Sequence, residues 1–357
     1  MQKTIFLFIA FVMLIGFIAP SNTVYANQSD WETAMNRSLD WLRYEISPNP
    51  IVGSVGGEWA VLALARANRV TADDPWVIGW LSDLDSVLAE VNRTLADYDI
   101  HNPPSVGTFP GELRRWTDFQ RVTLALSALG LDASNHNERD LTEIYSTFVP
   151  SAQRHALNQT INVDTFALIA LDATQKDGDR DAFIESLIDG QRPDGTWSLS
   201  PSLPSSSFDL DITAMALQAL APYYYQGDAR VTNAVNTALG WLRVQTFPDS
   251  ESTAQMIVAL TALGPDFAYE AAYYVDLLLT WFDPASGGFR RETSEGYANH
   301  MATEQAAYAL VSYWRFVNNM NPLYDMRDAF EIQSGQAAQT PIGRGKIAEM
   351  LEWARLI

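Results

Sequence analysis

Cysteine is absent from this 357-residue sequence, and lysine is scarce. Without cysteine the chain has no disulfide framework, no thiolate nucleophile and no cysteine-ligated metal centre. Lys3, Lys176 and Lys346 are its three lysines, so arginine supplies most of the positive charge. Acidic residues outnumber basic ones by 43 to 23, which gives a formal net charge of −20. Because such a surface repels phosphate groups, we expect no nucleic-acid partner and no electrostatic docking to anionic lipid.

The N-terminus has the pattern of a secretory signal peptide. Lys3 is followed by an apolar run over 5–19 and then by a polar stretch that ends in Val24-Tyr25-Ala26. We expect cleavage after Ala26, which leaves residues 27–357 as a single domain. An uncleaved anchor is the alternative, although the run is shorter than the ~20 residues that a spanning helix needs. The mature chain should be a monomer that is secreted or held at the cell surface, without an integral membrane segment.

Six short helices rich in alanine and leucine recur along the chain. Each has a central Ala-Leu pair, and the pairs follow one another at intervals of 43 to 62 residues, which is typical of a structural repeat with loop insertions. These helices are apolar nearly all round, so they should be buried on every side. The predicted ranges are Glu58–Asn68, Gln120–Leu129, Thr165–Ala173, Asp211–Leu220, Ala254–Leu263 and Glu304–Tyr313.

A second set of helices is amphipathic and precedes the first set one by one. Their predicted ranges are Trp31–Tyr44, Trp76–Leu95, Leu141–Val149, Asp181–Ile188, Val231–Val244 and Tyr269–Phe282. One apolar stripe and one charged face are typical of helices that cover a core. The hairpins, followed by a last helix over Lys346–Leu356, predict an all-α fold in the form of an α/α toroid, with an inner and an outer ring. An open solenoid is the alternative, but it would need polar capping repeats.

The turns between these helices carry motifs of a known superfamily. The segment Gln191–Trp197 (QRPDGTW) resembles the QxxDGxW repeat of squalene–hopene and other terpene cyclases, and Asp209–Leu217 resembles the helix start that carries their DxDD proton donor. The chain is similar to the α/α-toroid superfamily, which also holds protein prenyltransferase β subunits and the cobalamin carriers transcobalamin and intrinsic factor. The strongest similarity is to secreted bacterial proteins with prenyltransferase/squalene-cyclase-type repeats, through Asp211–Tyr224, Ser252–Gly264 and Asn299–Met326.

The motifs specify the fold better than the chemistry. By the resemblance, Asp211 matches the cyclase proton donor, but Ile212 replaces the neighbouring acid that supports it. A carboxyl group that protonates an alkene needs such support, and cyclases enclose their substrate between two α-domains where this chain supplies one. From the residues alone, Asp209 and Asp211 are expected to cap a helix.

The sequence contains few signs of a metal site or of a catalytic nucleophile. The superfamily's zinc site needs Asp, Cys and His, and the four histidines of this chain are scattered. Asp177, Asp179 and Asp181 alternate like the start of a calcium loop, but Ala182 stands where that loop needs glycine, which favours a solvated turn. No nucleophile-elbow motif supports a Ser/His/Asp triad. We therefore expect no metal and no cofactor, with cobalamin considered only as a bound ligand.

Parallel inner helices would bring their N-termini together at one mouth of the barrel. Carboxyl groups and aromatic rings around an apolar opening favour a ligand site there. The candidate binding residues are Glu58, Trp59, Asp118, Asp164, Trp197, Asp209, Asp211, His300, Glu304 and Tyr308, with Trp116 and Glu251 nearby. The alternative interpretation is that the acids only cap their helices.

The leading hypothesis is therefore a non-catalytic exported protein that binds a bulky amphipathic ligand or a cell-surface partner at this mouth. Through the resemblance to cobalamin carriers, a corrinoid is the first candidate ligand. An enzyme is the main alternative, either terpene-cyclase-like through Asp211 and Asp209 or carbohydrate-active through two mouth acids. A structural cell-surface module is the third.

Overall fold

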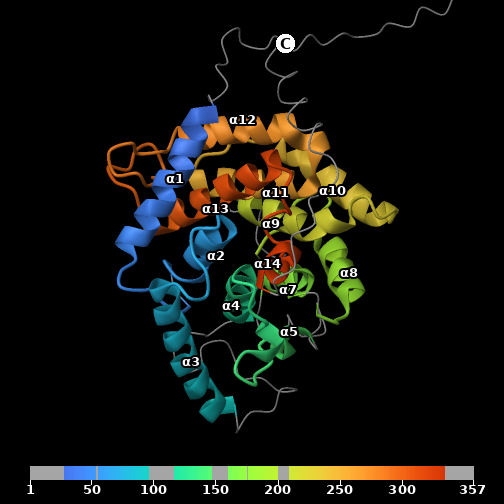
Figure 1. Ribbon diagram of the computed structural model, residues 1–357. Helices are drawn as coiled ribbons and strands as arrows, with labels where there is room; N and C mark the ends of the chain where they lie inside the picture. The colour runs from blue at the N-terminus through green and yellow to red at the C-terminus, as the bar shows by residue number, and fades with distance from the viewer. Residues whose placement is uncertain are drawn as a thin grey trace, which may run out of the picture.

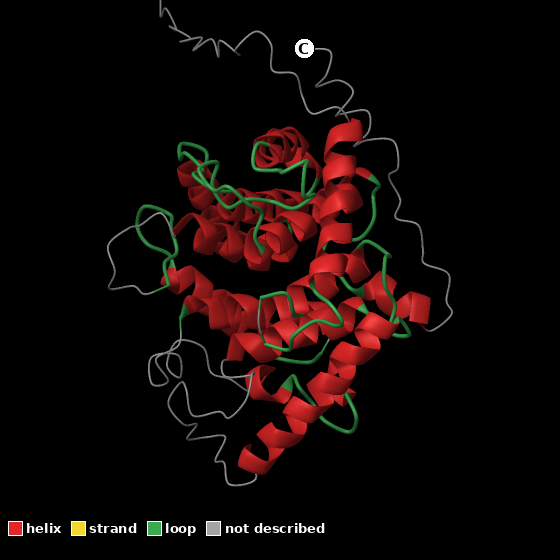
Figure 2. Cartoon of the chain, turned by 90° about the vertical axis from the view of Figure 1, so that its left-hand side faces the viewer, coloured by secondary structure: helices red, strands yellow, loops and turns green. Residues whose placement is uncertain are grey.

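The computed structural model describes residues 28–53, 55–95, 116–146, 160–174, 176–199 and 209–333. Within these ranges the chain is all-helical, with loops and two isolated β-bridges but no strand (Figure 2). The all-α prediction is confirmed. The predicted signal peptide and the predicted last helix, Lys346–Leu356, lie outside the described residues.

Each predicted Ala-Leu segment is a helix, and most of these helices extend further than predicted. We refer to them as the inner helices: α2 (Glu58–Arg66), α4 (Trp116–Ala128), α7 (Ile161–Thr174), α9 (Asp209–Leu220), α11 (Ser250–Leu263) and α13 (His300–Val317). In α11 every residue is buried except Ala262, as expected for a helix that is apolar all round. The alanines leave room for neighbouring helices to approach closely, and the leucines fill the space between them.

The amphipathic segments also form helices, which we refer to as the outer helices. They are α1 (Gln28–Glu45), α3 (Pro75–Leu95), α5 (Glu143–Ser146), α8 (Arg180–Gly190), α10 (Ala229–Leu242) and α12 (Ala268–Leu279). In Figure 1 these outer helices surround the rest, and α14 (Arg327–Gln333) lies near the centre of the view. Only α5 is much shorter than predicted: Leu141 and Thr142 form a turn before it, and residues 147–149 lie outside the described residues.

The inner helices contact one another in a closed cycle. The order is α2, α4, α7, α9, α11 and α13, and α13 packs against α2 again. Consecutive repeats are therefore neighbours in space, and the first and last are neighbours too.

Two hydrogen bonds between neighbouring inner helices join positions at similar heights. Near the N-termini, Gln120 of α4 donates to the Val163 carbonyl oxygen of α7 over 2.9 Å. Near the C-termini, the hydroxyls of Thr261 in α11 and Ser312 in α13 are 2.7 Å apart. These pairs fit helices that run in the same direction.

Outer helices pack mainly on the inner helix that precedes them in the chain. Helix α8 packs on α7, α10 on α9, and α12 on α11, whereas α1 packs chiefly on α13. The indole of Trp31 in α1 meets Tyr313 of α13 edge to face at 5.2 Å between centroids, and Arg37 donates to the Pro284 carbonyl oxygen. Helix α1, the first of the described helices, therefore serves as the outer helix that covers α13, the last inner helix.

The QxxDGxW-like turn links three helices through specific hydrogen bonds. Gln191 donates to the carbonyl oxygen of Ala234 in α10, and the buried indole of Trp197 donates to that of Leu187 in α8. The Trp197 amide donates to the Thr213 hydroxyl of α9 over 3.1 Å. The Phe289 amide donates in the same way to the Thr303 hydroxyl of α13 over 2.9 Å, so the same turn-to-helix hydrogen bond occurs twice.

Candidate functional site

The acidic end is the name we give to the N-terminal ends of the inner helices, with Glu58, Asp118, Asp211, Glu251 and Glu304. Two of these acids are fully buried and hold one loop. Glu58 accepts the amide of Gly53 over 2.8 Å, and Glu304 accepts the amide of Gly56 over 2.8 Å. The loop before α2 is thus fixed by a carboxyl group from α2 and by one from α13, across the point where the cycle of helices closes.

Arg121 balances part of the charge at this end. Its Nη2 donates to Asp118 over 2.8 Å, and its Nε lies 3.7 Å from Glu58 Oε2. Asp164 of α7 is buried and accepts the Ser186 hydroxyl of α8 over 2.5 Å. Asp118 therefore belongs to the same cluster as Glu58, whereas Asp164 ties an inner helix to an outer one.

A second group of acids lies at the starts of α9 and α11. Asp249, directly before α11, accepts both the amide and the hydroxyl of Ser252, and that hydroxyl is also in hydrogen-bonding contact with Asp211. Arg291 approaches Glu251 and Asp249, at 3.7 Å and 3.8 Å. Asp211 is partly exposed, and its Oδ1 has no hydrogen-bond partner among the described residues.

Burial raises the pKa of several of these carboxyl groups, which therefore stay protonated at a higher pH than exposed carboxyl groups do. It raises the pKa of Asp211 to about 6, against the lowering effect of Ser252 and Arg291. It raises the pKa of Glu251 to about 7, and the charges of Asp249 and Asp211 add to the shift that Arg291 opposes. Glu304 reaches about 8, and the pKa of Glu58 is raised by the same cause.

Aromatic rings from three inner helices meet inside the cycle. The Trp59 ring of α2 lies 5.7 Å from Phe166 of α7 and 5.5 Å from Tyr308 of α13, between centroids. Trp59 is partly exposed, while Tyr308 is buried and accepts a hydrogen bond from Gln255 of α11. Burial raises the pKa of Tyr308 well above its ordinary value, and the Glu304 and Asp211 charges contribute. The acids and the aromatic rings therefore form one region.

The remaining predicted binding residues are Trp197, His300 and Asp209. Trp197 is completely buried in its turn, so its ring offers no surface to a ligand. His300 begins α13 at the acidic end, and its ring lies 5.0 Å from that of Trp41 of α1 at a tilt of 57°. Asp209 begins α9, and its side chain lies outside the described residues.

Arg291 was not predicted from the sequence. It lies in the loop before α13, and its backbone oxygen accepts the amide of Ser250. No motif marks this arginine, and the only available signal is its position next to Arg290 in a chain that has few basic residues.

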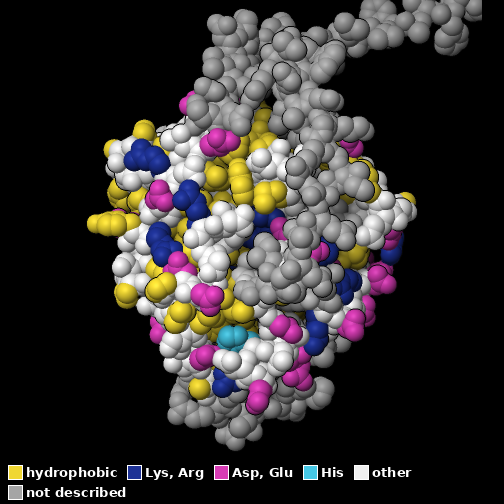
Figure 3. All heavy atoms as spheres, in the orientation of Figure 1, with side chains coloured by type: hydrophobic (Ala, Val, Ile, Leu, Met, Phe, Trp, Pro, Cys, Tyr) yellow, Lys and Arg dark blue, Asp and Glu magenta, His cyan; other side chains and the backbone are white. Residues whose placement is uncertain are grey.

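Metal-binding geometry is not found in the described part of the chain, where no three His, Asp or Glu side chains are grouped to hold an ion. No helix in the described ranges has the length and apolarity that crossing a membrane requires. On the face drawn in Figure 3, acidic side chains are scattered among basic ones rather than collected in one patch.

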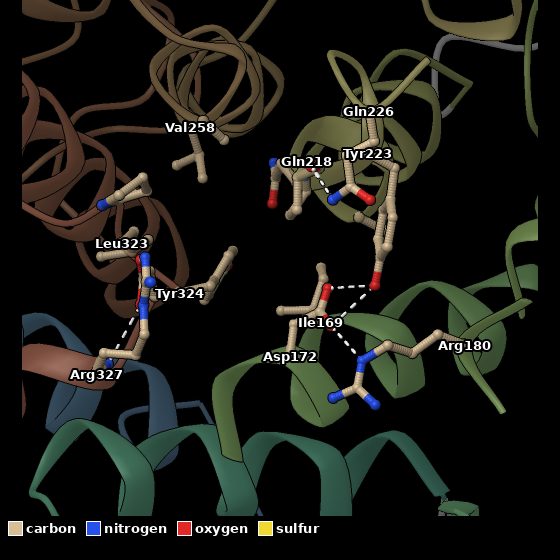
Figure 4. A pocket seen from close by; sticks show the side chains of 15 residues that line it. Ile169, Asp172, Arg180, Gln218, Tyr223, Gln226, Val258, Leu323, Tyr324 and Arg327 are labelled. Atoms are coloured by element: carbon tan, nitrogen blue, oxygen red, sulfur yellow. Dashed lines mark hydrogen bonds and ion pairs between the residues drawn. The ribbon is translucent and has the colours of Figure 1, made fainter. Parts of the chain in front are cut away.

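A cavity of about 610 Å³ lies at the other end of the inner helices. Its lining includes Ile169 near the end of α7, Gln218 near the end of α9, and Ala262 near the end of α11. Figure 4 shows Leu323 and Tyr324 across the cavity from Tyr223. The sequence predicted a site only at the N-terminal ends.

No family model matches this chain, and no curated protein matches it either.

Proposed function

We propose that the protein is an exported α/α-toroid protein that binds a bulky amphipathic ligand at its acidic end without catalysing a reaction. The toroid assignment is supported by the closed cycle of six inner helices and by the outer helices packed around them. The motifs that resemble terpene cyclases and cobalamin carriers support the same class. Export rests on the signal-peptide pattern of residues 1–26.

The observation that carries the binding proposal is the pair Asp211 and Glu251 beside the aromatic cluster. With pKa values of about 6 and about 7, the two carboxyls differ in protonation near neutral pH. Glu251 then donates a hydrogen bond while Asp211 accepts one. A carboxamide presents the complementary pair, since its oxygen accepts and its nitrogen donates. Corrinoids carry such amides around an apolar ring, which supports a corrinoid as the first ligand to test.

Thermal unfolding of the purified chain with cyanocobalamin tests this proposal. Binding to the folded state raises the melting temperature, because a ligand at ~100 times its dissociation constant stabilises by about 2.7 kcal/mol. The rise should be larger at pH 6 than at pH 8, where Glu251 has lost its proton. No rise with cyanocobalamin at either pH would contradict the corrinoid assignment.

Glu251→Gln sharpens the same test. The glutamine keeps a hydrogen-bond donor at every pH, so the cyanocobalamin response should no longer fall between pH 6 and pH 8. Glu270→Gln is the matched control, since Glu270 lies on outer helix α12 and pairs with Arg243. If Glu251→Gln leaves the pH dependence of binding unchanged, the ligand does not contact Glu251.

An enzyme is the second candidate, and the raised pKa values of Asp211 and Glu251 favour it. One protonated and one ionised carboxyl can act as general acid and general base on a polyprenyl or glycosidic substrate. Incubation with farnesol, squalene and an oligosaccharide panel, followed by product analysis, tests for turnover. Any turnover should disappear in Asp211→Asn; turnover that persists unchanged removes Asp211 from a catalytic role.

A further inference from the structure

The cavity opposite the acidic end has its own chemistry. Its walls are largely apolar, with Ile169, Val258, Ala262 and Leu323 among the lining residues. A cavity of about 610 Å³ falls within the ~300–1,000 Å³ range of small-molecule sites. Ala262 is the one residue of α11 that is not buried, and it lines the cavity.

The charged groups around the cavity are already neutralised. Asp172 accepts the Tyr223 hydroxyl over 2.9 Å and Arg180 Nε over 2.7 Å. Asp325 accepts Arg327 Nε over 2.8 Å. Figure 4 shows the first pair on one side of the cavity and Arg327 on the other. Since each carboxylate has its own arginine, the cavity presents no uncompensated charge and favours a neutral molecule.

One buried polar atom on the cavity wall has no partner among the described residues, and it is Gln218 Oε1. The side chain is 3% exposed. Its Nε2 donates to the backbone oxygen of Gln255 over 2.9 Å and to Gln255 Oε1 over 3.0 Å. A backbone oxygen only accepts, so the amide cannot be turned round, and Oε1 is fixed as a bare acceptor. Such a buried atom needs a donor.

We infer that this cavity is a second ligand site, which takes a neutral, mostly apolar molecule with one hydrogen-bond donor directed at Gln218 Oε1. Its lining residues are distinct from those of the acidic end, and Gln255 contacts both Gln218 and Tyr308. Its walls hold the apolar part of the molecule, and Gln218 selects the hydroxyl, amine or amide N–H.

The fluorescent amine 1-aminoanthracene tests this site, because it is neutral, flat and apolar and carries a single amino donor. Titration of the purified chain should give saturable fluorescence enhancement with one site per chain. Anthracene lacks the donor and should displace the probe with roughly tenfold lower affinity, a difference that corresponds to ~1.4 kcal/mol. An absence of saturable enhancement, or equal affinity for the two molecules, would overturn the inference.

Two variants locate the probe. Gln218→Met keeps the side-chain length without the acceptor and should lower the affinity for 1-aminoanthracene about tenfold. Ala262→Phe fills the cavity from α11 and should abolish binding; it does not touch the Gln218–Gln255 bonds, so it remains informative if Gln218→Met fails to fold. Asp211→Asn at the acidic end should leave the affinity unchanged. Binding that survives Ala262→Phe, or is lost in Asp211→Asn, would place the probe elsewhere and refute the site.

Discussion

At the scale of single residues, the buried carboxyl groups of the acidic end separate into two kinds. Glu58 and Glu304 fix the loop that precedes α2, because they accept hydrogen bonds from the amides of Gly53 and Gly56. Asp211 and Glu251 are bound less completely, and they lie next to Arg291 rather than in a loop. The loop-holding pair therefore contributes to stability, and the second pair is available to a ligand.

Glu304 should make the stability of the protein depend on pH. Burial raises its pKa to about 8 in the folded chain, so the folded state binds more protons than the unfolded state between about pH 4.5 and pH 8. Stability from this group is complete below the unfolded pKa and is lost as pH rises through the folded pKa. Glu304→Gln keeps an acceptor for Gly56 and carries no charge. It should unfold at higher urea concentration than the parent at pH 9, with little difference at pH 5.

Glu185→Gln is the control for this measurement, since Glu185 is exposed on outer helix α8 and pairs with Arg230. It should show no pH-dependent gain. If Glu304→Gln and the parent chain have the same difference in urea midpoint at both pH values, Glu304 is not buried in protonated form.

At the scale of helices and turns, the sequence predicts the positions of the helices, which depend on residues close together in the chain. The Ala-Leu pairs and the amphipathic stripes place each helix within a few residues, because burial on all sides and burial on one side leave different patterns. Which outer helix packs on which inner helix is not local, and the packing of α1 on α13 could not be predicted. The cavity at the C-terminal ends was missed for the same reason, since Gln218 and Asp172 look like ordinary helix residues.

The QxxDGxW-like turn gives a prediction at this scale. Gly195 has φ +94°, and a Cβ there would meet the backbone oxygen of Thr237 in α10 at 2.9 Å. Gly195→Ala should therefore lose stability from both backbone strain and this clash, by several kcal/mol in urea unfolding. Gly227→Ala is the matched control, because Gly227 has φ +95° with nothing within 4 Å. It should cost only the strain, about 1–2 kcal/mol; equal losses in the two variants would mean that the turn does not press on α10.

At the scale of the whole molecule, buried arginines hold the cycle of helices closed. Arg66 at the end of α2 and Arg315 near the end of α13 both donate to Asp328 of α14, and Arg315 also donates to the Arg66 backbone oxygen over 2.9 Å. Burial lowers the pKa of Arg315 to about 10, opposed by Asp328. The first and last inner helices thus share one carboxylate as an ion-pair partner at their C-terminal ends.

Asp328→Asn should destabilise the whole chain. Removing one partner of a buried ion pair costs ~3–5 kcal/mol, because a charge is left uncompensated. Asp266→Asn is the control, since Asp266 accepts the hydroxyl of the exposed Tyr225 and its replacement should cost little. Far-UV circular dichroism and tryptophan fluorescence should follow one transition in parent and variant, as a single domain requires. A separate early transition in Asp328→Asn would mean that closure is an independent unit.

The packing of α1 on α13 also bears on the order of events during synthesis and folding. Arg37 and Pro284, which hydrogen-bond to each other, are 247 residues apart in the chain. Contacts of such long range form late, because much chain entropy is lost before they contribute. The N-terminal helix leaves the ribosome first, yet its apolar face has no permanent partner until almost the entire described chain has followed. For the export proposed above this delay would be an advantage, because the chain cannot adopt its final fold before its C-terminal part has been made.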